Sequence, residues 1–228
     1  MATTMPTEIA LLNLLQLASP ALPLGAYCYS EGLEYLCQQE ITNAQQLTHW
    51  LTQELGYGAI RIEAALMLRG YRYAQDLERL EYWNHWLTAH KETKELRQQS
   101  AQMGKSLLDL MLNLTPNPVL QRMKQQRQTA IHYALIFGVA AAHGQVPLES
   151  ALLAFLQSWA SNLIIAGVKL IPLGQTAGQQ VLMNTHQVIV QVSPSILNLA
   201  DDQLYCCSLG LGLASMNHES QYSRLFRS

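Results

Sequence analysis

The tripeptide Gly104-Lys105-Ser106 could do chemistry, because it matches the end of a phosphate-binding loop. The complete loop also needs a glycine five positions before Gly104, and Gln99 occupies that place. The flanking residues have the pattern of a continuous helix, whose interior amides are already hydrogen-bonded and cannot hold a phosphate. The sequence therefore predicts no nucleotide binding at this segment.

The cysteines and histidines form no recognisable metal or catalytic motif. The chain has 7 histidines, which are scattered, and four cysteines without a Cys-x-x-Cys spacing: Cys28, Cys37, Cys206 and Cys207. The patterns HExxH, GxSxG and the EF-hand loop are also missing from the sequence. We predict no bound metal, no other cofactor and no enzymatic activity. A small-molecule enzyme built on a helical bundle stays open as the alternative, and convergent acids with shifted pKa values in a pocket would support it.

Composition indicates one large globular domain with partners. The 228 residues are 49% hydrophobic and only 13% charged, where about 25% charged residues is usual. Apolar surface left over after the core is filled often marks an interface. The net charge of −2 gives no global field that would attract nucleic acid. The N-terminus lacks the basic and apolar regions of a secretory signal, so we expect a cytoplasmic protein.

Charge is distributed unevenly along the chain. Residues 1–60 contain five glutamates and no lysine or arginine, whereas residues 61–127 contain 11 basic and 7 acidic residues. This asymmetry indicates either ordinary scatter on solvated helix faces or an acidic face that meets a basic or cationic partner.

Leucine spacing predicts helices over most of the chain. Apolar residues recur at steps of three, four or seven over residues 43–70 and 92–114, which places them on one helical face. Asn43 stands where a helix N-cap is useful. The run Val188–Val192 is β-like, but an isolated strand forms no sheet, so we expect a helix end or a covered extended piece. We predict a single all-α domain of about ten helices over residues 1–228.

The uncharged stretch Ser150–Val168 is long enough to cross a membrane. Polar residues cluster in its middle, namely Gln157, Ser158, Ser161 and Asn162. We therefore expect the central helix of a bundle, hydrophobic on all sides, rather than a membrane span. A membrane-associated protein is the third interpretation, and extraction without detergent would exclude it.

The two ends of the chain carry the most unusual patterns. Near the start, Ser30 could cap a helix led by Glu31 and Glu34. The C-terminal tail, residues 218–228, alternates aromatic and aliphatic residues with arginines, and these types often anchor interfaces. The alternative for this tail is a helix end folded back on its own core.

Four segments resemble the family of urease accessory protein F (UreF). Residues 19–34 resemble its SPxLPxGxxxYSxGLE region, and residues 93–97 its TxELR segment. Residues 166–175 resemble its AxVKLxPxGQ segment, and residues 218–228 its HExQYSRLFRS ending. The match runs in order over nearly the whole chain. The departures are Cys28 where serine is frequent, Ser220 where threonine is common, and Asn217 in place of a frequent basic residue.

This resemblance implies an all-α protein that dimerises and delivers nickel to urease without catalysing a reaction itself. Its partners would be a UreD/UreH-type accessory protein, the GTPase UreG and the urease apoprotein. The resemblance implies partner-binding residues in the tail: His218, Glu219, Tyr222, Arg224, Leu225, Phe226 and Arg227. It also suggests a surface facing the GTPase or the nickel path: Glu31, Glu34, Lys169 and Gln175.

We expect the C-terminal tail to be mobile or self-docked in the isolated protein and ordered in the complex. Tyr222 and Phe226 are four residues apart, so on a helix they would share one face. On this basis, deleting residues 218–228 should abolish partner binding and leave the helical fold and its melting temperature nearly unchanged.

Overall fold

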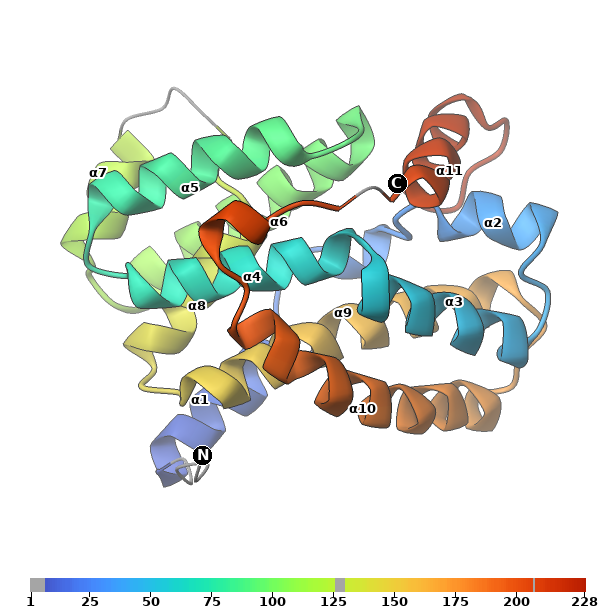
Figure 1. The fold of residues 1–228 in the computed structure, drawn as a ribbon, viewed down its shortest axis with the longest axis horizontal. Helices are drawn as coiled ribbons and strands as arrows, with labels where there is room; N and C mark the ends of the chain where they lie inside the picture. The colour runs from blue at the N-terminus through green and yellow to red at the C-terminus, as the bar shows by residue number, and fades with distance from the viewer. Residues whose placement is uncertain (1–6, 126–129, 207) are drawn as a thin grey trace.

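Eleven α-helices and two 3-10 helices build the described part of the chain, residues 7–125, 130–206 and 208–228, in this computed structural model (Figure 1). Cys207 and residues 1–6 and 126–129 lie outside these ranges. The first half holds α1 Glu8–Ala18, η1 Ala26–Cys28, α2 Leu33–Gln39, α3 Ala44–Tyr57, α4 Ala59–Arg72, α5 Leu77–His90 and α6 Lys94–Leu114. The second half holds α7 Pro118–Gln125, α8 Tyr133–His143, α9 Leu148–Leu170, α10 Gln175–Leu197, η2 Asp201–Gln203 and α11 Leu209–Ser220. The described ranges contain no strand, and the predicted all-α fold is confirmed.

The centre of the bundle is the crossing of α4 and α8. Helix α8 is buried continuously from Ala134 to Ala141, as expected for a helix that neighbours cover on all sides. Gly70 and Gly138 let the two backbones touch. A Cβ atom on Gly138 would lie 2.0 Å from the carbonyl oxygen of Met67, and one on Gly70 would lie 2.2 Å from that of Leu135. Only glycine is compatible with this spacing.

Helix boundaries follow local chemistry, with corrections to the expected ranges. The predicted N-cap Asn43 is confirmed, because its side chain accepts a hydrogen bond from the Gln46 amide at 3.0 Å. Residues 43–70 form two helices instead of one, because the extended backbone of Gly58 separates α3 from α4. The β-like run 188–192 lies inside α10, where packing against α9 and α3 overrides β propensity.

Helix α9 is the core helix that the uncharged stretch predicted. Its 23 residues are long and apolar enough to cross a membrane, and it is the one such helix among the residues described. However, 61% of its most apolar window is buried inside the bundle. Apolar side chains of α9 contribute to the two larger hydrophobic clusters of the molecule. Burial in the protein therefore accounts for its composition.

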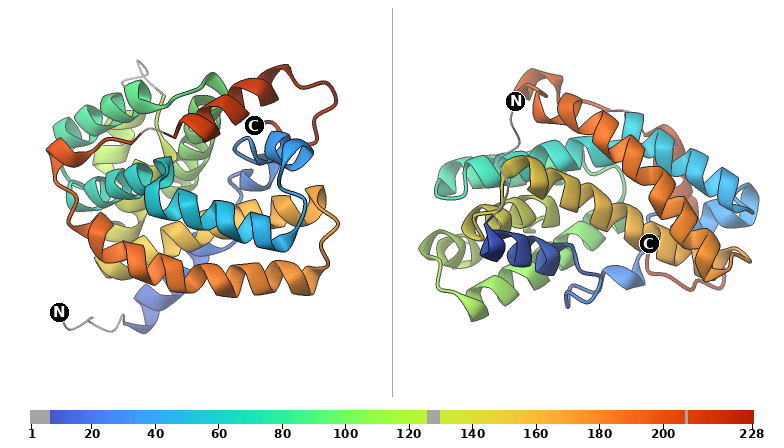
Figure 2. Two further views of the ribbon diagram at one scale, coloured as in Figure 1. Left: turned by 45° about the vertical axis from the view of Figure 1, so that its right-hand side comes forward. Right: turned by 90° about the horizontal axis from the view of Figure 1, so that it is seen from below.

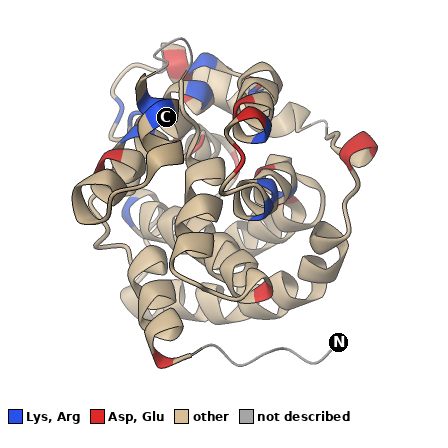
Figure 3. Ribbon diagram, turned by 90° about the vertical axis from the view of Figure 1, so that its left-hand side faces the viewer, with Lys and Arg blue, Asp and Glu red and all other residues tan. Residues whose placement is uncertain are grey.

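In Figure 3 most of the ribbon segments coloured for charged residues lie in the upper part of the view, and the N-terminus lies in the lower part. Helix α10 carries no Lys, Arg, Asp or Glu, and α1 carries only Glu8. The C-terminus lies beside α2 and α11, on the side of the molecule away from α1, as Figures 1 and 2 show from different directions. Residues 28–34 and the end of the sequence thus meet in space, and the candidate site forms there.

Candidate functional site

Glu34, in the first turn of α2, holds the backbone of the C-terminal tail. Its carboxylate accepts hydrogen bonds from the amides of Leu225 at 2.7 Å and Phe226 at 2.9 Å. The side chain is almost completely buried, and Phe226 joins the hydrophobic cluster formed by α2, α3 and α9. A buried carboxylate needs such donors, so Glu34 and the tail stabilise each other.

Four charged side chains form a tail clamp: Glu34, Glu95, His218 and Arg224. His218 is fully buried, with Nδ1 2.8 Å from an oxygen of Glu95 and Nε2 3.2 Å from an oxygen of Glu34. Both ring nitrogens can donate only when the imidazole carries a proton on each. Arg224 donates to the other oxygen of Glu95 at 2.8 Å. The carboxylates of Glu34 and Glu95 thus hold buried His218 and the partly exposed guanidinium of Arg224 through hydrogen bonds.

The last residue of the tail is seated in the body of the protein. The Ser228 carbonyl oxygen accepts from the Ser30 amide at 2.7 Å and from its hydroxyl at 2.5 Å. The Arg227 amide donates to the Cys28 carbonyl at 2.8 Å. Ser30 is not the N-cap residue of α2, because the helix starts at Leu33 after Gly32. Its hydroxyl nevertheless accepts from the Glu34 amide in the first turn at 3.4 Å, as a capping side chain would, and it also donates to Ser228.

The docked tail corrects the expectation about its shape. Residues after Ser220 are not helical, so Tyr222 and Phe226 do not share a face: Tyr222 is 98% exposed, whereas Phe226 is buried. Deleting residues 218–228 would remove the donors to Glu34 and Glu95 and uncover the apolar cluster that Phe226 joins. We therefore now expect a lower melting temperature for the truncated chain instead of an unchanged one.

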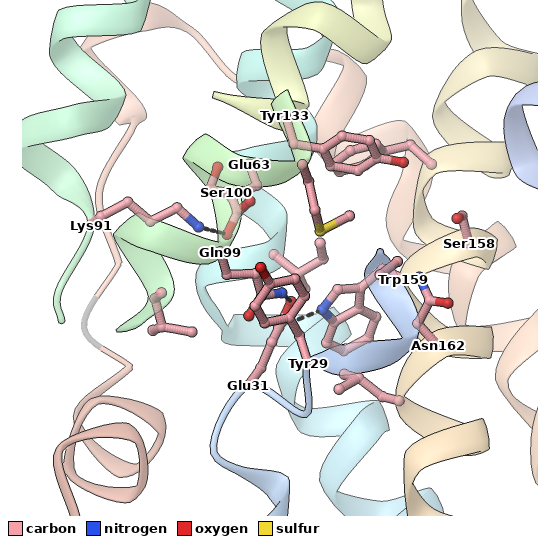
Figure 4. A pocket seen from close by; sticks show the side chains of 16 residues that line it. Tyr29, Glu31, Glu63, Lys91, Gln99, Ser100, Tyr133, Ser158, Trp159 and Asn162 are labelled. Carbon is pink, nitrogen blue, oxygen red and sulfur yellow. Dashed lines mark hydrogen bonds and ion pairs between the residues drawn. The ribbon is translucent and has the colours of Figure 1, made fainter. Parts of the chain in front are cut away.

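A second group of acids lines a cavity of the bundle and is called here the interior carboxylate cluster: Glu31, Glu54 and Glu63, which are half-buried, and Glu92, which is exposed at its edge. Glu31 has a left-handed backbone with φ of 53°, and its side chain lines two cavities of the bundle. Its carboxylate accepts from Gln99 Nε2 at 2.8 Å and Trp159 Nε1 at 2.9 Å (Figure 4). Burial and the nearby Glu63, itself paired with Lys91, raise the pKa of Glu31 above its ordinary value.

These positions correct the hypothesis of an acidic N-terminal face. Of the five glutamates in residues 1–60, Glu34 is buried in the clamp, and Glu31 and Glu54 point into the interior. Burial, together with Glu31 and Glu92, raises the pKa of Glu54 to about 7. One Glu54 oxygen is buried with no hydrogen-bond partner among the residues described. The acids are therefore mostly internal rather than presented to a partner.

The interior carboxylate cluster meets only part of the criterion set for an enzyme. The acids converge, and burial raises the pKa of Glu31, Glu54 and Glu92, but they line two cavities of about 40 and 20 Å³. Ligand sites are usually about 300–1,000 Å³. Ser100 beside His132, at 3.1 Å, resembles a nucleophile and its base, yet burial lowers the pKa of His132 to about 3, and its neutral ring is a weak base. These cavities have room for a few water molecules and none for a substrate.

The structure gathers most of the predicted site residues around the docked tail. The Lys169 ammonium lies 5.7 Å from the centre of the Phe226 ring, over the outer side of the tail. Glu219 pairs with Lys94 at 3.2 Å on the surface. Gln175 is exposed at the first residue of α10 and takes no part in the hydrogen bonds described for the tail. Leu225 and Arg227 point outward, in contrast to Phe226 between them.

Three residues of this site were not singled out from the sequence: Glu95, Gln99 and Trp159. Glu95 lies in the segment that resembles TxELR, and Gln99 follows it by four residues, so the two share one face of α6. That spacing was the available signal for a polar face opposite the tail. Trp159 gave no signal, because an indole in an apolar helix is typical of a core.

Neutralising Glu54 is expected to stabilise the protein increasingly as pH rises above about 4.5, with the full gain above about pH 7. Its folded pKa lies above its ordinary 4.5, so ionisation costs stability as pH rises from about 4.5 to about 7. Glu54→Gln should therefore raise the free energy of unfolding at pH 8 by about 2–3 kcal/mol, or Tm by roughly 4–10 °C. At pH 4 the gain should vanish. Thermal melts at both pH values test this, with exposed Glu40→Gln as control, and an equal gain at both would contradict the assignment.

The fold and the site define an all-helical protein of the accessory or adaptor class, in which interface-type side chains are presented on a firmly docked tail. A model of the UreF family matches residues 41–186. The chain is 53% identical to the urease accessory protein UreF of Nostoc sp. over the whole of both chains. It is 50% identical to the UreF protein of Synechocystis sp. over 96% of this chain and 98% of that one. It is also 38% identical to the UreF protein of Pseudoalteromonas translucida, over 99% and 97% respectively. The chain belongs to the UreF family of urease accessory proteins, and it is an accessory protein rather than an enzyme.

Proposed function

We propose that this chain is a cytoplasmic scaffold that joins a UreD/UreH-type accessory protein to the GTPase UreG and regulates GTP-dependent delivery of nickel to the urease apoprotein. Membership of the UreF family supports a role in urease maturation. The docked tail is the observation that supports the proposed role as a scaffold for these partners. Glu34 holds the tail from the protein interior, and Tyr222 and Leu225 are exposed on its solvent side.

The outer side of the tail and the adjacent helix provide a surface for the UreD-type partner. Tyr222 and Leu225 expose 98% and 65% of their area, and Arg227 is exposed beside them. Helix α11 adds an apolar stripe at positions i, i+4 and i+7, made of Leu209, Leu213 and Met216, all exposed. Aromatic and arginine anchors next to an apolar helix face are typical of protein interfaces. A rigid backbone also lowers the entropic cost of binding.

The four residues predicted to face the GTPase or the nickel path differ in their exposure to solvent. Lys169 and Gln175 are exposed and are our proposed contacts for the GTPase. Glu31 and Glu34 are covered, so they would act on a partner through the position of the tail. We also propose a homodimer, supported by the apolar, almost uncharged outer face of α1. A symmetric interface places like residues together, so a neutral apolar face suits it.

Tyr222→Ala is expected to weaken binding of the UreD-type partner while the fold remains intact, because the side chain makes almost no contact within the chain. Truncating an aromatic anchor typically costs about 2 kcal/mol or more, which is roughly thirtyfold in Kd. Isothermal titration calorimetry with the purified partner measures the change. Tyr57→Ala, at an exposed tyrosine that ends α3, is the matched control. Unchanged affinity of the Tyr222 variant would remove the tail from the proposed interface.

A further inference from the structure

Residues 30–33 form a tight turn between the docked tail and the cavities of the bundle. The Leu33 amide donates to the Ser30 carbonyl at 2.9 Å, and the two residues between them, Glu31 and Gly32, have φ values of 53° and 79°. Two successive left-handed residues define a type I′ turn, whose central positions favour glycine, asparagine and aspartate. The turn is therefore strained at Glu31, because a left-handed backbone is unfavourable for a residue with a long side chain.

The C-terminal tail holds the chain on both sides of this turn. Before the turn, Ser30 donates its amide at 2.7 Å and its hydroxyl at 2.5 Å to the Ser228 carbonyl oxygen. The Arg227 amide donates to the Cys28 carbonyl at 2.8 Å. After the turn, Glu34 accepts from two further amides of the tail. These contacts fix where the turn begins and ends, and so they offset its strain.

The Glu31 carboxylate is held on the cavity side of the turn by two donors, Gln99 at 2.8 Å and Trp159 at 2.9 Å (Figure 4). Burial opposes this position. It raises the pKa of Glu31, which means that the charged carboxylate is less stable there than in water. Desolvation and backbone strain thus both favour an outward position of Glu31, and the two hydrogen bonds and the tail favour the inward one.

We propose that the docked tail is a strap that keeps the Glu31 carboxylate turned toward Trp159. When the tail detaches, Ser30 loses its partner, the turn relaxes to a negative φ at Glu31, and the carboxylate leaves the indole for solvent. The movement takes one acid from the lining of both cavities. A change at the surface of the molecule is in this way transmitted to its interior while the helices stay in place.

The indole N–H of Trp159 reports this movement directly, because Glu31 is its acceptor. Exchange of the indole protons of the four tryptophans is followed by NMR in deuterated water, and Trp159→Phe assigns the resonance. Deleting residues 224–228 removes the strap and retains α11 with His218. We expect the Trp159 proton to exchange about tenfold faster in the truncated chain, the effect of losing one hydrogen bond. Tyr222→Ala leaves the docking contacts in place and should keep the unmodified rate.

The reverse direction needs no deletion. By linkage, removing an inner anchor of Glu31 must loosen the tail. Trp159→Phe should therefore accelerate exchange of the Arg227 amide roughly tenfold. Trp86→Phe, at another half-buried indole that packs on the larger hydrophobic cluster, is the matched control and should leave this amide unchanged. Equal exchange of the Arg227 amide in the two variants would contradict the coupling.

The same deletion on a Glu31→Ala background separates the strap from a general loosening of the fold. Glu31→Ala already leaves the indole without its acceptor, so the deletion should add little to the exchange rate of Trp159 if the tail acts through Glu31. Circular dichroism confirms that each variant is folded. A further tenfold acceleration on this background would overturn the proposal. It would also be overturned by an unmodified Trp159 rate in the truncated chain that retains Glu31, or by equal acceleration of the Trp83 indole.

Discussion

Replacing Glu34 with alanine is expected to release the C-terminal tail from the body of the protein. The change removes the acceptor of the Leu225 and Phe226 amides and leaves buried His218 with one carboxylate instead of two. Leaving a buried donor without its acceptor costs about 1–3 kcal/mol, and here two amides lose theirs. Because the tail can detach without the rest unfolding, we expect amide exchange of residues 221–228 to accelerate roughly 100-fold or more.

Hydrogen exchange read by mass spectrometry measures this release, with Glu40→Ala as the control. Glu40 ends the same helix α2 but is exposed, so its removal should leave tail exchange unchanged. Exchange at the unmodified rate in the Glu34 variant would show that the other contacts of the tail, those of Phe226, Arg224 and Ser228 among them, hold it without Glu34.

The second large effect is expected at the crossing of α4 and α8. Gly138→Ala places a Cβ atom 2.0 Å from the Met67 carbonyl oxygen and 2.6 Å from the Tyr71 amide nitrogen. No rotamer change relieves this overlap, because both contacts are with backbone atoms. The helices must separate and open the core, so we expect a loss of about 4 kcal/mol or more and a fall in Tm of roughly 10 °C or more.

Gly56→Ala provides the comparison for this prediction, because a Cβ atom there has no heavy atom within 4 Å. An alanine inside a helix is intrinsically more favourable than glycine by about 0.8–1.0 kcal/mol, so this control should be slightly stabilised. Thermal unfolding followed by circular dichroism measures both variants. A Gly138→Ala chain as stable as the unmodified protein would mean that the two helices cross at a greater distance than the structure shows.

The elements of this fold could be predicted because their signals are local. Leucine spacing marked α3, α4 and α6, the side chain of Asn43 marked a helix start, and the uncharged stretch marked α9 as the core helix. The break at Gly58 was missed, because a helical glycine and a helix-ending glycine look the same in sequence. The run 188–192 was ambiguous, since packing decides between a buried helix and a strand.

The candidate site could be predicted only in part, since its contacts join distant residues. The types of side chain in the tail indicated an interface. The sequence could not show that Glu34 binds the backbone amides of Leu225 and Phe226, which are 191 and 192 positions away along the chain. It also could not show which side chains face inward: Phe226 is buried, whereas neighbouring Leu225 is exposed. Which side chains of a non-helical segment are buried depends on the surface of the helical bundle against which the segment packs. The resemblance to the UreF family identified the residues, and the structure supplies their geometry.

The central claim is that the partner binds the tail in its docked position, and a double-mutant cycle tests it most directly. Calorimetric titration of the UreD-type partner into the unmodified chain, Tyr222→Ala, Glu34→Ala and the double variant gives four dissociation constants. If Glu34 acts only by seating the tail, Glu34→Ala should weaken binding at least tenfold, and adding Tyr222→Ala should cost little more. If the two losses add in full, or if the Glu34 variant binds as tightly as the unmodified chain, the docked tail is not the surface that the partner recognises.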